Sequence, residues 1–275
     1  MSGPVWVNGA LVDPSVAALS VFDHGFTVGD GVFETLLSYP DTGLAFAGQH
    51  LMRLRGSAAG LALHVPFEDA DLMIAMREVI DSAGPAGTAM RVRITVTGGA
   101  GPLGSDRGGA TPTVIVIAAP QSPWPPTATL APVAWPRNER GALAGLKTTS
   151  YAENVVALHA AHDAGADEAL FCDTRGNVSE GTGTNVFAVI DDNLLTPPLT
   201  TGCLAGVTRG VVISCYGARE TNFSIGDLAR AAEVFVTSTT REVQAVCEVL
   251  GVGKWDGPGP ITTEAHNAYT SARKA

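Results

Sequence analysis

One lysine of the sequence lies in surroundings that suit covalent chemistry. The 275 residues include three lysines, at positions 147, 254 and 274, and 14 arginines. Lys254 stands in a Gly/Pro-rich hairpin region and Lys274 at the end of the chain, whereas Lys147 lies in Gly145-Leu-Lys-Thr-Thr-Ser150, between an expected strand and an expected helix. A lysine amine can form a Schiff base when its neutral form is accessible. Lys147 is therefore the candidate amine nucleophile, with a surface loop lysine as the open alternative.

Three further features would suit a phosphorylated pyridine aldehyde. Two expected helix starts, at Gly206-Val-Thr208 and Ser238-Thr239, offer free amides and hydroxyls to a dianion. Arg53, in His50-Leu-Met-Arg-Leu, can add a bidentate guanidinium. Glu180, in Val-Ser-Glu-Gly-Thr-Gly183, follows an expected hairpin strand and could keep a pyridine nitrogen protonated. Each feature also has a simpler interpretation as a helix cap, a surface ion pair or a Gly-rich turn.

Two other motifs have better structural explanations. Gly99-Ala-Gly101-Pro-Leu-Gly104 satisfies G-x-G-x-x-G, but that motif needs a helix start aimed at a pyrophosphate, and Pro102 predicts a loop instead. His159 and His162 are one helical turn apart among residues of exposed type, which predicts a solvated helix face and no metal site. The spacing of the four cysteines indicates neither a metal or redox pair nor a disulfide framework.

Composition favours an enzyme that acts on a small molecule. Acidic residues number 27 and basic residues 17, for a formal net charge of -10, and no long Lys/Arg run is present. A nucleic-acid or anionic-membrane surface is therefore disfavoured. No apolar run approaches the roughly 18 residues that span a bilayer, and the first residues lack the pattern of a signal peptide. We expect a cytoplasmic protein of one or two domains whose partner is a small molecule.

A Pro-rich stretch predicts the domain boundary. Residues 118–126 hold four prolines within seven positions, which disfavours both a helix and a central strand. We expect a small α+β domain at 1–117, a linker at 118–126 and a larger domain at 127–275. Periodicity predicts strands at 5–7, 45–47, 90–97, 113–118, 168–173, 186–190 and 234–237, and helices at 49–63, 69–82 and 208–217. Two S/T-x-x-E capping boxes, at 150–153 and 239–242, predict further helix starts, the first helix ending near residue 164.

Eight short motifs follow one another along the chain. They are Val7-Asn-Gly9, Phe22-Asp-His-Gly25, Gly29-Asp-Gly-Val-Phe-Glu-Thr35, His50-Leu-Met-Arg53-Leu, Leu146-Lys147-Thr-x-Ser-Tyr151-x-x-Asn154, Ser179-Glu180-Gly-x-x-x-Asn185-Val-Phe, Gly206-Val-Thr208-Arg209 and Thr237-Ser-Thr-Thr240-x-Glu-Val. Taken in this order, the motifs resemble those of the fold-type IV pyridoxal-phosphate enzymes, which include branched-chain aminotransferases, D-amino-acid aminotransferases and 4-amino-4-deoxychorismate lyases. The resemblance covers nearly the whole chain.

The resemblance implies a role for each matching residue. Lys147 corresponds to the Schiff-base lysine and Glu180 to the partner of the pyridine nitrogen. The implied phosphate ligands are Arg53, the Val207-Thr208 backbone and Thr239 with its neighbour Ser238. Tyr151 falls near the tyrosine that contacts the ring hydroxyl, one residue closer to the lysine than in the branched-chain enzymes. The implied fold is α+β, with a small domain, a larger pseudobarrel domain and pyridoxal 5'-phosphate between them, in a homodimer with active sites near the interface.

Within the family, the sequence most resembles the lyases. Thr35 matches a threonine implicated in proton handling, Phe33 replaces the active-site tyrosine of the D-amino-acid enzymes, and Ala89-Met-Arg91 lacks the tyrosine of the branched-chain pattern. The expected reaction converts 4-amino-4-deoxychorismate to 4-aminobenzoate and pyruvate, a step of folate precursor synthesis, with Lys147 and Thr35 as catalytic residues.

The substrate-binding groups and two other functions stay open at this point. Phe33, Arg107 and Thr240 are the candidate substrate-binding residues. A transaminase that acts on branched-chain or D-amino acids with 2-oxoglutarate is the alternative to the lyase. A cofactor-free binding protein on the same fold is a more remote one.

Overall fold

The computed structural model describes residues 3–84 and 87–275, which divide into two compact units. Unit 1 comprises Met1–Ser122 and Leu146–Tyr151, and unit 2 comprises Pro123–Gly145 and Ala152–Ala275. Residues 1–2 of the expected first domain lie outside the described part. The segment that carries Lys147 groups with unit 1, although it follows the Pro-rich stretch in sequence, because its backbone is hydrogen-bonded to residues 29–33.

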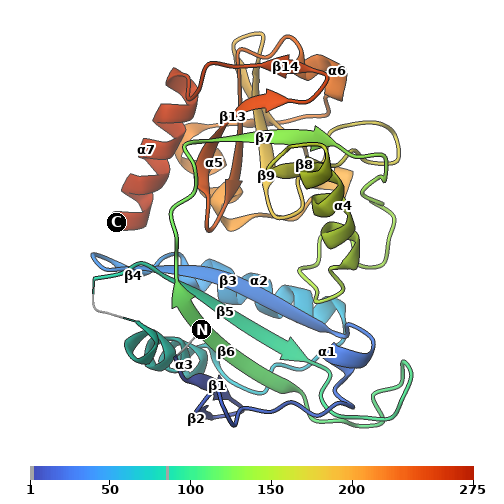
Figure 1. The fold of residues 1–275 in the computed structure, drawn as a ribbon, viewed down its shortest axis with the longest axis vertical. Coiled ribbons are helices and arrows are strands. Elements are labelled where there is room, and N and C mark those ends of the chain that lie inside the picture. Colours follow the sequence, from blue (N-terminus) through green and yellow to red (C-terminus); the bar gives the residue numbers. More distant parts are fainter. Residues whose placement is uncertain (1–2, 85–86) are drawn as a thin grey trace. The chain divides into compact units, whose positions relative to one another are not determined.

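Unit 1 is built on one antiparallel sheet (Figure 1). Over the described residues this sheet has six strands, in the order β2-β1-β6-β5-β3-β4. Its strands are β1 (Val5–Val7), β2 (Ala10–Val12), β3 (Gly31–Tyr39), β4 (Gly43–Leu44), β5 (Met90–Thr97) and β6 (Thr113–Pro120), and its helices are α1 (His24–Thr27), α2 (Ala47–Gly60) and α3 (Asp69–Ala83).

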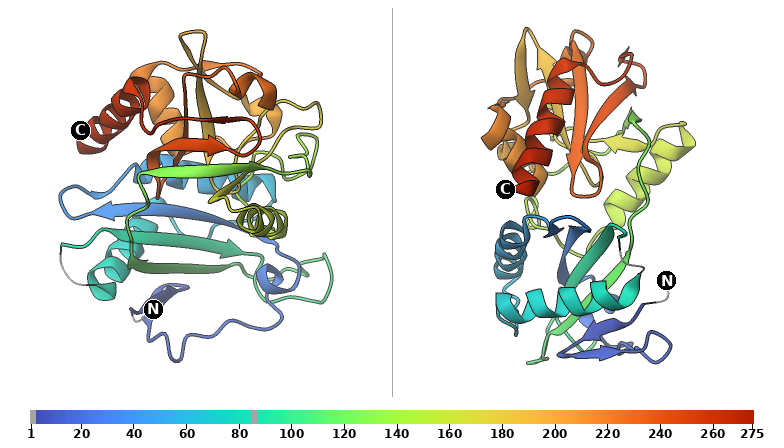
Figure 2. Two further views of the ribbon diagram at one scale, coloured as in Figure 1. Left: turned by 45° about the horizontal axis from the view of Figure 1, so that its top comes forward. Right: turned by 90° about the vertical axis from the view of Figure 1, so that its left-hand side faces the viewer.

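Alternation along the strands decides which face of this sheet is the core. Val92, Ile94 and Val96 of β5 are fully buried and pack with the apolar residues of α2 and α3. Both helices lie along the sheet (Figure 2), α2 on β3 and α3 on β6. Because side chains alternate along a strand, Arg91, Arg93 and Thr95 point to the opposite face. That face is the one that holds functional candidates.

Two expectations for unit 1 are wrong. Residues 45–47 are not a strand, because β4 ends at Leu44 and α2 begins at Ala47. The Pro-rich stretch does not begin at 118 as a linker, because β6 continues to Pro120, which pairs with Met90 of β5. On its other side β6 pairs with β1 only at 115 and 116, so the missing amide of Pro120 costs no ladder bond there.

Unit 2 contains a mixed sheet with helices packed against it. Its strand order over the described residues is β11-β10-β9-β12-β13-β7-β8, with β14 paired to β13. The strands are β7 (Thr127–Pro132), β8 (Glu168–Leu170), β9 (Asn185–Ile190), β10 (Asn193–Thr196), β11 (Arg219–Glu220), β12 (Glu233–Ser238), β13 (Glu242–Val249) and β14 (Gly253–Lys254), and the helices are α4 (Ala152–Asp163), η1 (Leu199–Thr201), α5 (Val207–Tyr216), α6 (Ile225–Leu228) and α7 (Pro260–Lys274).

The central strands of unit 2 are buried on both faces. Every residue of β9 is buried, and Phe187 stacks on Phe235 of β12 with ring centres 4.8 Å apart. A strand buried on both faces reads as a continuous apolar run, which is why its sequence predicted it. Within the described residues, no helix of the chain is long and apolar enough to cross a membrane.

The two capping-box predictions met different outcomes. Near the first box a helix does form, but it begins at Ala152 and the Ser150 hydroxyl donates to the carbonyl of Gly29 at 2.9 Å. The second prediction is wrong, because residues 239–241 form the turn of the hairpin between β12 and β13. The β-rich run of β13 pairs with β12 and outweighs the local capping signal. Helix α7 carried no signal that we recognised in the sequence.

The first testable prediction concerns the start of α7. Glu233 accepts hydrogen bonds from the amides of Ile261 at 3.0 Å and Thr262 at 2.8 Å. Replacing Glu233 with Ala leaves these first-turn amides unpaired, so we expect the free energy of unfolding to fall by about 1–2 kcal/mol in urea titrations. Glu78→Ala, at an exposed position of α3, is the control. Equal losses in the two variants would contradict the capping role.

Candidate active site

The backbone around Lys147 is fixed by two elements of unit 1. The carbonyl of Lys147 accepts from the amide of Phe33 at 3.0 Å, and the amide of Thr149 donates to the carbonyl of Gly31 at 2.8 Å. The amide of Lys147 donates to the hydroxyl of Ser57, on α2, at 3.1 Å. The segment is therefore held against the start of β3 and against α2.

The side chain of Lys147 lies over an aromatic ring that it shares with another cation. Its Nζ is 4.3 Å from the ring centre of Phe33, and the guanidinium of Arg93 is 3.7 Å from the same centre. Tyr151 meets that ring edge-on, with centres 5.4 Å apart. Cations bind aromatic faces through the ring quadrupole. The structure thus brings three of the predicted site residues, Lys147, Phe33 and Tyr151, together with Arg93.

Arg93 is a half-buried cation. Burial lowers its pKa from the usual value, but a guanidinium keeps its proton at neutral pH. Its Nε donates to Thr95 at 3.2 Å, and no carboxylate of the described residues forms an ion pair with it. Thr35 lies directly opposite Arg93 in the β3–β5 pairing, on the same face. This face therefore presents a cation that an incoming carboxylate could pair with.

Beneath β3 lies a buried charged cluster that joins the strand to α2. Glu34 is fully buried and accepts from Arg53 through both oxygens, Nε to Oε1 at 2.7 Å and Nη2 to Oε2 at 2.8 Å. His50 Nδ1 lies 2.7 Å from Oε2 of the same carboxylate. Such a bidentate pair fixes the plane of the guanidinium. Arg53, the predicted phosphate ligand, is therefore held in one orientation.

The cluster sets the charge of its members. Burial would raise the pKa of Glu34, but the hydrogen bonds from Arg53 and His50 outweigh it and lower the pKa to about 2. Burial lowers the pKa of His50, against the opposing effect of Glu34. Glu34 is accordingly ionised and His50 neutral near pH 7, with the imidazole donating its Nδ1 hydrogen.

In unit 2, the carboxyl group of Glu180 has two polar partners. Its Oε2 accepts from the amide of Leu204 at 2.9 Å, and its Oε1 lies 3.1 Å from Nε of Arg137. Arg137 stacks on Phe171 at 4.2 Å and donates to Glu153 at 2.9 Å. An adjacent guanidinium favours the ionised form of a carboxylate. Glu180 is thus prepared to interact with a positive group such as a protonated ring nitrogen.

The other predicted residues of unit 2 gather near the start of α5. Val207 and Thr208 are the first two residues of the helix, so their amides are among those without a partner inside the helix. Gly206 precedes them, and a Cβ there would lie 2.0 Å from Oδ1 of Asn185. Asn185 pairs with Thr237 across β9 and β12, and the Thr237 hydroxyl is buried with no hydrogen-bond partner among the described residues.

Ser238, Thr239 and Thr240 follow directly after Thr237. Ser238 ends β12, and Thr239 and Thr240 lie in the hairpin turn rather than at a helix start. Any phosphate contact from Thr239 therefore comes from a turn, not from a helix dipole. The chain still offers amides and hydroxyls at this end of the sheet.

Arg107, a predicted substrate ligand, is engaged within unit 1. Its guanidinium makes a bidentate pair with Asp30 at 2.6 Å for both bonds, and also donates to the carbonyls of Leu61 at 2.9 Å and Ala62 at 2.7 Å. Binding a substrate carboxylate would require this arrangement to open.

Sequence reasoning missed four residues of these clusters: Glu34, His50, Arg93 and Arg137. For Arg93 a signal existed, because the alternation of β5 places it on the face opposite the core. His50 and Glu34 stood within the matched segments, but a buried polar pair is not visible without the fold. Nothing in the pattern around Arg137 marked it.

Comparisons with known proteins place these clusters in a family. The model of the family described as amino-transferase class IV matches residues 31–249. A putative branched-chain-amino-acid aminotransferase of Methanocaldococcus jannaschii is 34% identical over 268 residues, 90% of this chain and 88% of that protein. A D-alanine aminotransferase of Bacillus licheniformis is 31% identical, over 98% of this chain and 96% of its own.

Solved structures agree with this result. The branched-chain aminotransferase of Thermoproteus uzoniensis, determined with norvaline, superposes with a TM-score of 0.91 at 29% identity and covers 100% of this chain and 96% of its own. The branched-chain amino acid aminotransferase of Escherichia coli gives 0.92 at 26%, with coverage of 99% and 95%. The chain therefore has the α+β fold of the fold-type IV enzymes, as the sequence predicted.

The second prediction concerns pH and His50. Because burial holds its pKa below the usual 6.5, the unfolded chain takes up a proton below that pH that the folded chain does not, so stability falls on acidification. We expect the urea midpoint of unit 1 to drop between about pH 7 and about pH 5, and His50→Gln to reduce that drop. His159→Gln, at an exposed position, should leave it unchanged. Identical pH slopes for His50→Gln and the parent would contradict this account.

Proposed function

The chain belongs to the class IV aminotransferases, and from this premise we propose that it is a transaminase of small amino acids that uses pyridoxal phosphate. The observation that carries the proposal is the meeting of Lys147 and Arg93 on the ring of Phe33. An amine nucleophile and a half-buried guanidinium together suit a substrate with both an amino group and a carboxylate.

The residues of both units fit the cofactor. Lys147 supplies the amine for the aldehyde, and Arg53, oriented by Glu34, supplies a guanidinium for the phosphate. The first amides of α5 and the unpartnered hydroxyl of Thr237 are further phosphate donors. The carboxyl group of Glu180, which Arg137 and the Leu204 amide orient, suits a protonated ring nitrogen. We assign these residues to cofactor binding, with Tyr151 and Thr239 as additional contacts.

Pyridoxal phosphate supplies an electron sink for a carbanion at the substrate α carbon. Lys147, once its amine is free, takes the proton from that carbon and returns a proton in the later step. Glu180 would hold the proton on the ring nitrogen, and Arg137 orients the Glu180 carboxyl group. Arg93 holds the substrate carboxylate. Thr35 lies next to Arg93, directly opposite it in the β3–β5 pairing. The ring of Phe33 contacts both the amine of Lys147 and the guanidinium of Arg93.

The proposal takes the transaminase in place of the lyase that the motifs favoured. The relatives described above are named branched-chain or D-alanine aminotransferases. Lyase and transaminase share every cofactor contact and differ only in the fate of the substrate. We extend the proposal to a homodimer, which would cover the apolar residues exposed on unit 1, among them Val16, Val21 and Phe26.

The third prediction tests the reaction. Purified protein with pyridoxal phosphate should form glutamate from 2-oxoglutarate with branched-chain or D-amino acids. Lys147→Ala should lower the rate by on the order of 10²–10⁴-fold and abolish the cofactor adduct fixed by borohydride, because the amine acts as nucleophile and base. Lys254→Ala, whose lysine pairs with Glu248 on the surface, is the control.

The same assay separates the lyase. In a parallel reaction the protein is given 4-amino-4-deoxychorismate, and 4-aminobenzoate is measured. Formation of 4-aminobenzoate without glutamate formation from any amino acid would sink the transaminase proposal. A protein that stays colourless with added pyridoxal phosphate would contradict both enzymes.

The fourth prediction concerns Arg93. The variant Arg93→Gln loses the charge-assisted bond to the substrate carboxylate, which contributes about 1.5–3 kcal/mol. We therefore expect KM for amino acids to rise by about 10–100-fold. In the same variant, KM for a primary amine that lacks a carboxylate should change little. Arg91→Gln is the matched control, because Arg91 lies on the same strand and face and bonds Gln121. Equal loss for both kinds of amine would exclude a carboxylate-binding role.

A further inference from the structure

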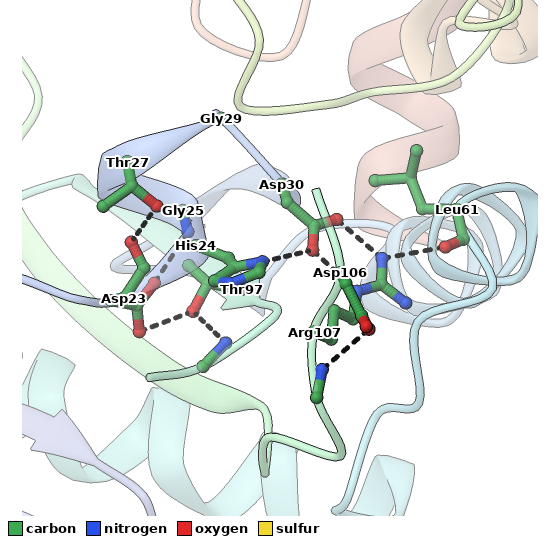
Figure 3. Close-up of polar contacts among 12 residues, drawn as sticks. Asp23, His24, Gly25, Thr27, Gly29, Asp30, Leu61, Thr97, Asp106 and Arg107 are labelled. Carbon is green, nitrogen blue, oxygen red and sulfur yellow. Dashed lines mark hydrogen bonds and ion pairs between the residues drawn. The ribbon is translucent and has the colours of Figure 1, made fainter. Parts of the chain in front are cut away.

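Arg107 joins three separate segments of unit 1. It lies in the Gly-rich loop between β5 and β6, and its guanidinium donates to both oxygens of Asp30 and to the carbonyl of Leu61 (Figure 3). It also donates to the carbonyl of Ala62. Leu61 caps the C-terminal end of α2, where backbone carbonyls lack partners within the helix. A cation at that end is favoured by the helix dipole. Arg107 therefore ties the start of β3 to the end of α2.

Both tied elements hold the segment that carries Lys147. Next to Asp30, the carbonyl of Gly29 accepts the hydroxyls of Thr149 and Ser150, each at 2.9 Å. Gly31 accepts the amide of Thr149, as described above. From α2, Ser57 accepts the amide of Lys147. The backbone of Lys147 thus depends on β3 and α2 keeping their relative position.

The Gly-rich loop itself has other attachments. His24 is fully buried, and its Nε2 lies 2.8 Å from the carbonyl of Pro102. The amide of Gly101 donates to the carbonyl of Phe22 at 3.2 Å. Asp23 accepts the hydroxyl of Thr97, at one end of the loop, at 2.9 Å (Figure 3). It also accepts the hydroxyl of Thr113, at the other end, at 2.9 Å. The loop is therefore anchored without Arg107, whose bonds lead outward to β3 and α2.

From this arrangement we propose that Arg107 and Asp30 form a positioning pair for Lys147, and that Arg107 does not bind the substrate. Four bonds occupy the guanidinium, and two of them run to a carboxylate in the bidentate geometry that is strongest for arginine. The inference rests on the proposed role of Lys147. It concerns the rigidity of the lysine's backbone and not contact with any ligand.

The test is hydrogen exchange of the full-length protein without cofactor. Arg107→Gln and Asp30→Asn should each raise the exchange rate of the peptide over 146–151 by about tenfold, because both loosen the same frame. In the double variant, the exchange rate over 146–151 should be close to that of either single variant, because the two residues act as one pair. Arg55→Gln is the matched control, because Arg55 of α2 also pairs with a carboxylate, that of Asp69 on α3. It should leave exchange over 146–151 unchanged.

Kinetics of the loaded enzyme separate positioning from substrate binding. A positioning pair predicts that both variants lower kcat for all amines by a similar factor and leave KM within about twofold. If Arg107 instead bound the substrate, Arg107→Gln would raise KM. Asp30→Asn would then cause no loss of activity, because it releases the guanidinium for the substrate. That second pattern, or unchanged exchange over 146–151 in Arg107→Gln, would overturn the proposal.

Two safeguards keep the test decisive. If Arg107→Gln does not fold, Arg107→Lys keeps the charge, loses the bidentate geometry and carries the same expectations. Because exchange is measured without cofactor, a colourless protein with faster exchange over 146–151 would refute the proposed enzyme while supporting the pair. A protein that is an active transaminase but whose variants show unchanged exchange over 146–151 would support the proposed enzyme and refute the pair.

Discussion

The ionised carboxylate of Glu34 inside the core of unit 1 is the constraint on which the rest of the site depends. A buried charge persists only when its partners are fixed, and Arg53 and His50 fix it from α2. Because side chains alternate along β3, Glu34 points to the helices while Phe33 points to Lys147. The pairing that locks α2 to β3 also places Ser57 beneath the lysine's amide. One buried charge thereby sets the position of Arg53, the proposed phosphate donor, and of Lys147, the proposed nucleophile.

The elements that sequence periodicity predicted correctly are those that burial decides, whereas β3, β7 and β13 were not among the predicted strands. The apolar alternation of 90–97 and the continuous apolar run of 186–190 have one stable arrangement each, and both strands formed as expected. Local signals of smaller energy were less reliable. A capping box contributes about 1 kcal/mol, so the pairing of β12 with β13 overrides the one at 239–242. The strand expected at 45–47 is likewise absent, because α2 begins at Ala47.

The sequence marked a candidate residue wherever a single residue would carry the proposed chemistry. The scarcity of lysine isolated Lys147, and the ordered motifs pointed to Arg53 and Glu180. Groups that act through a partner were not predictable, since a partnership needs the fold. Arg107 shows the difference: its sequence suggested a cation for a substrate, whereas the structure gives it Asp30 as a neighbour 77 positions away. Arg93 shows the converse, a strand arginine whose neighbours turn it into a candidate ligand.

The division of the chain has a consequence for the order of folding. Residues 146–151 belong to unit 1, yet unit 2 supplies the chain on both sides of them. During synthesis the first 122 residues leave the ribosome without this segment. Unit 1 therefore cannot complete its hydrogen bonds at Gly29, Gly31 and Phe33 until part of unit 2 has been made. The segment that carries Lys147 therefore enters unit 1 after all the rest of that unit has been made.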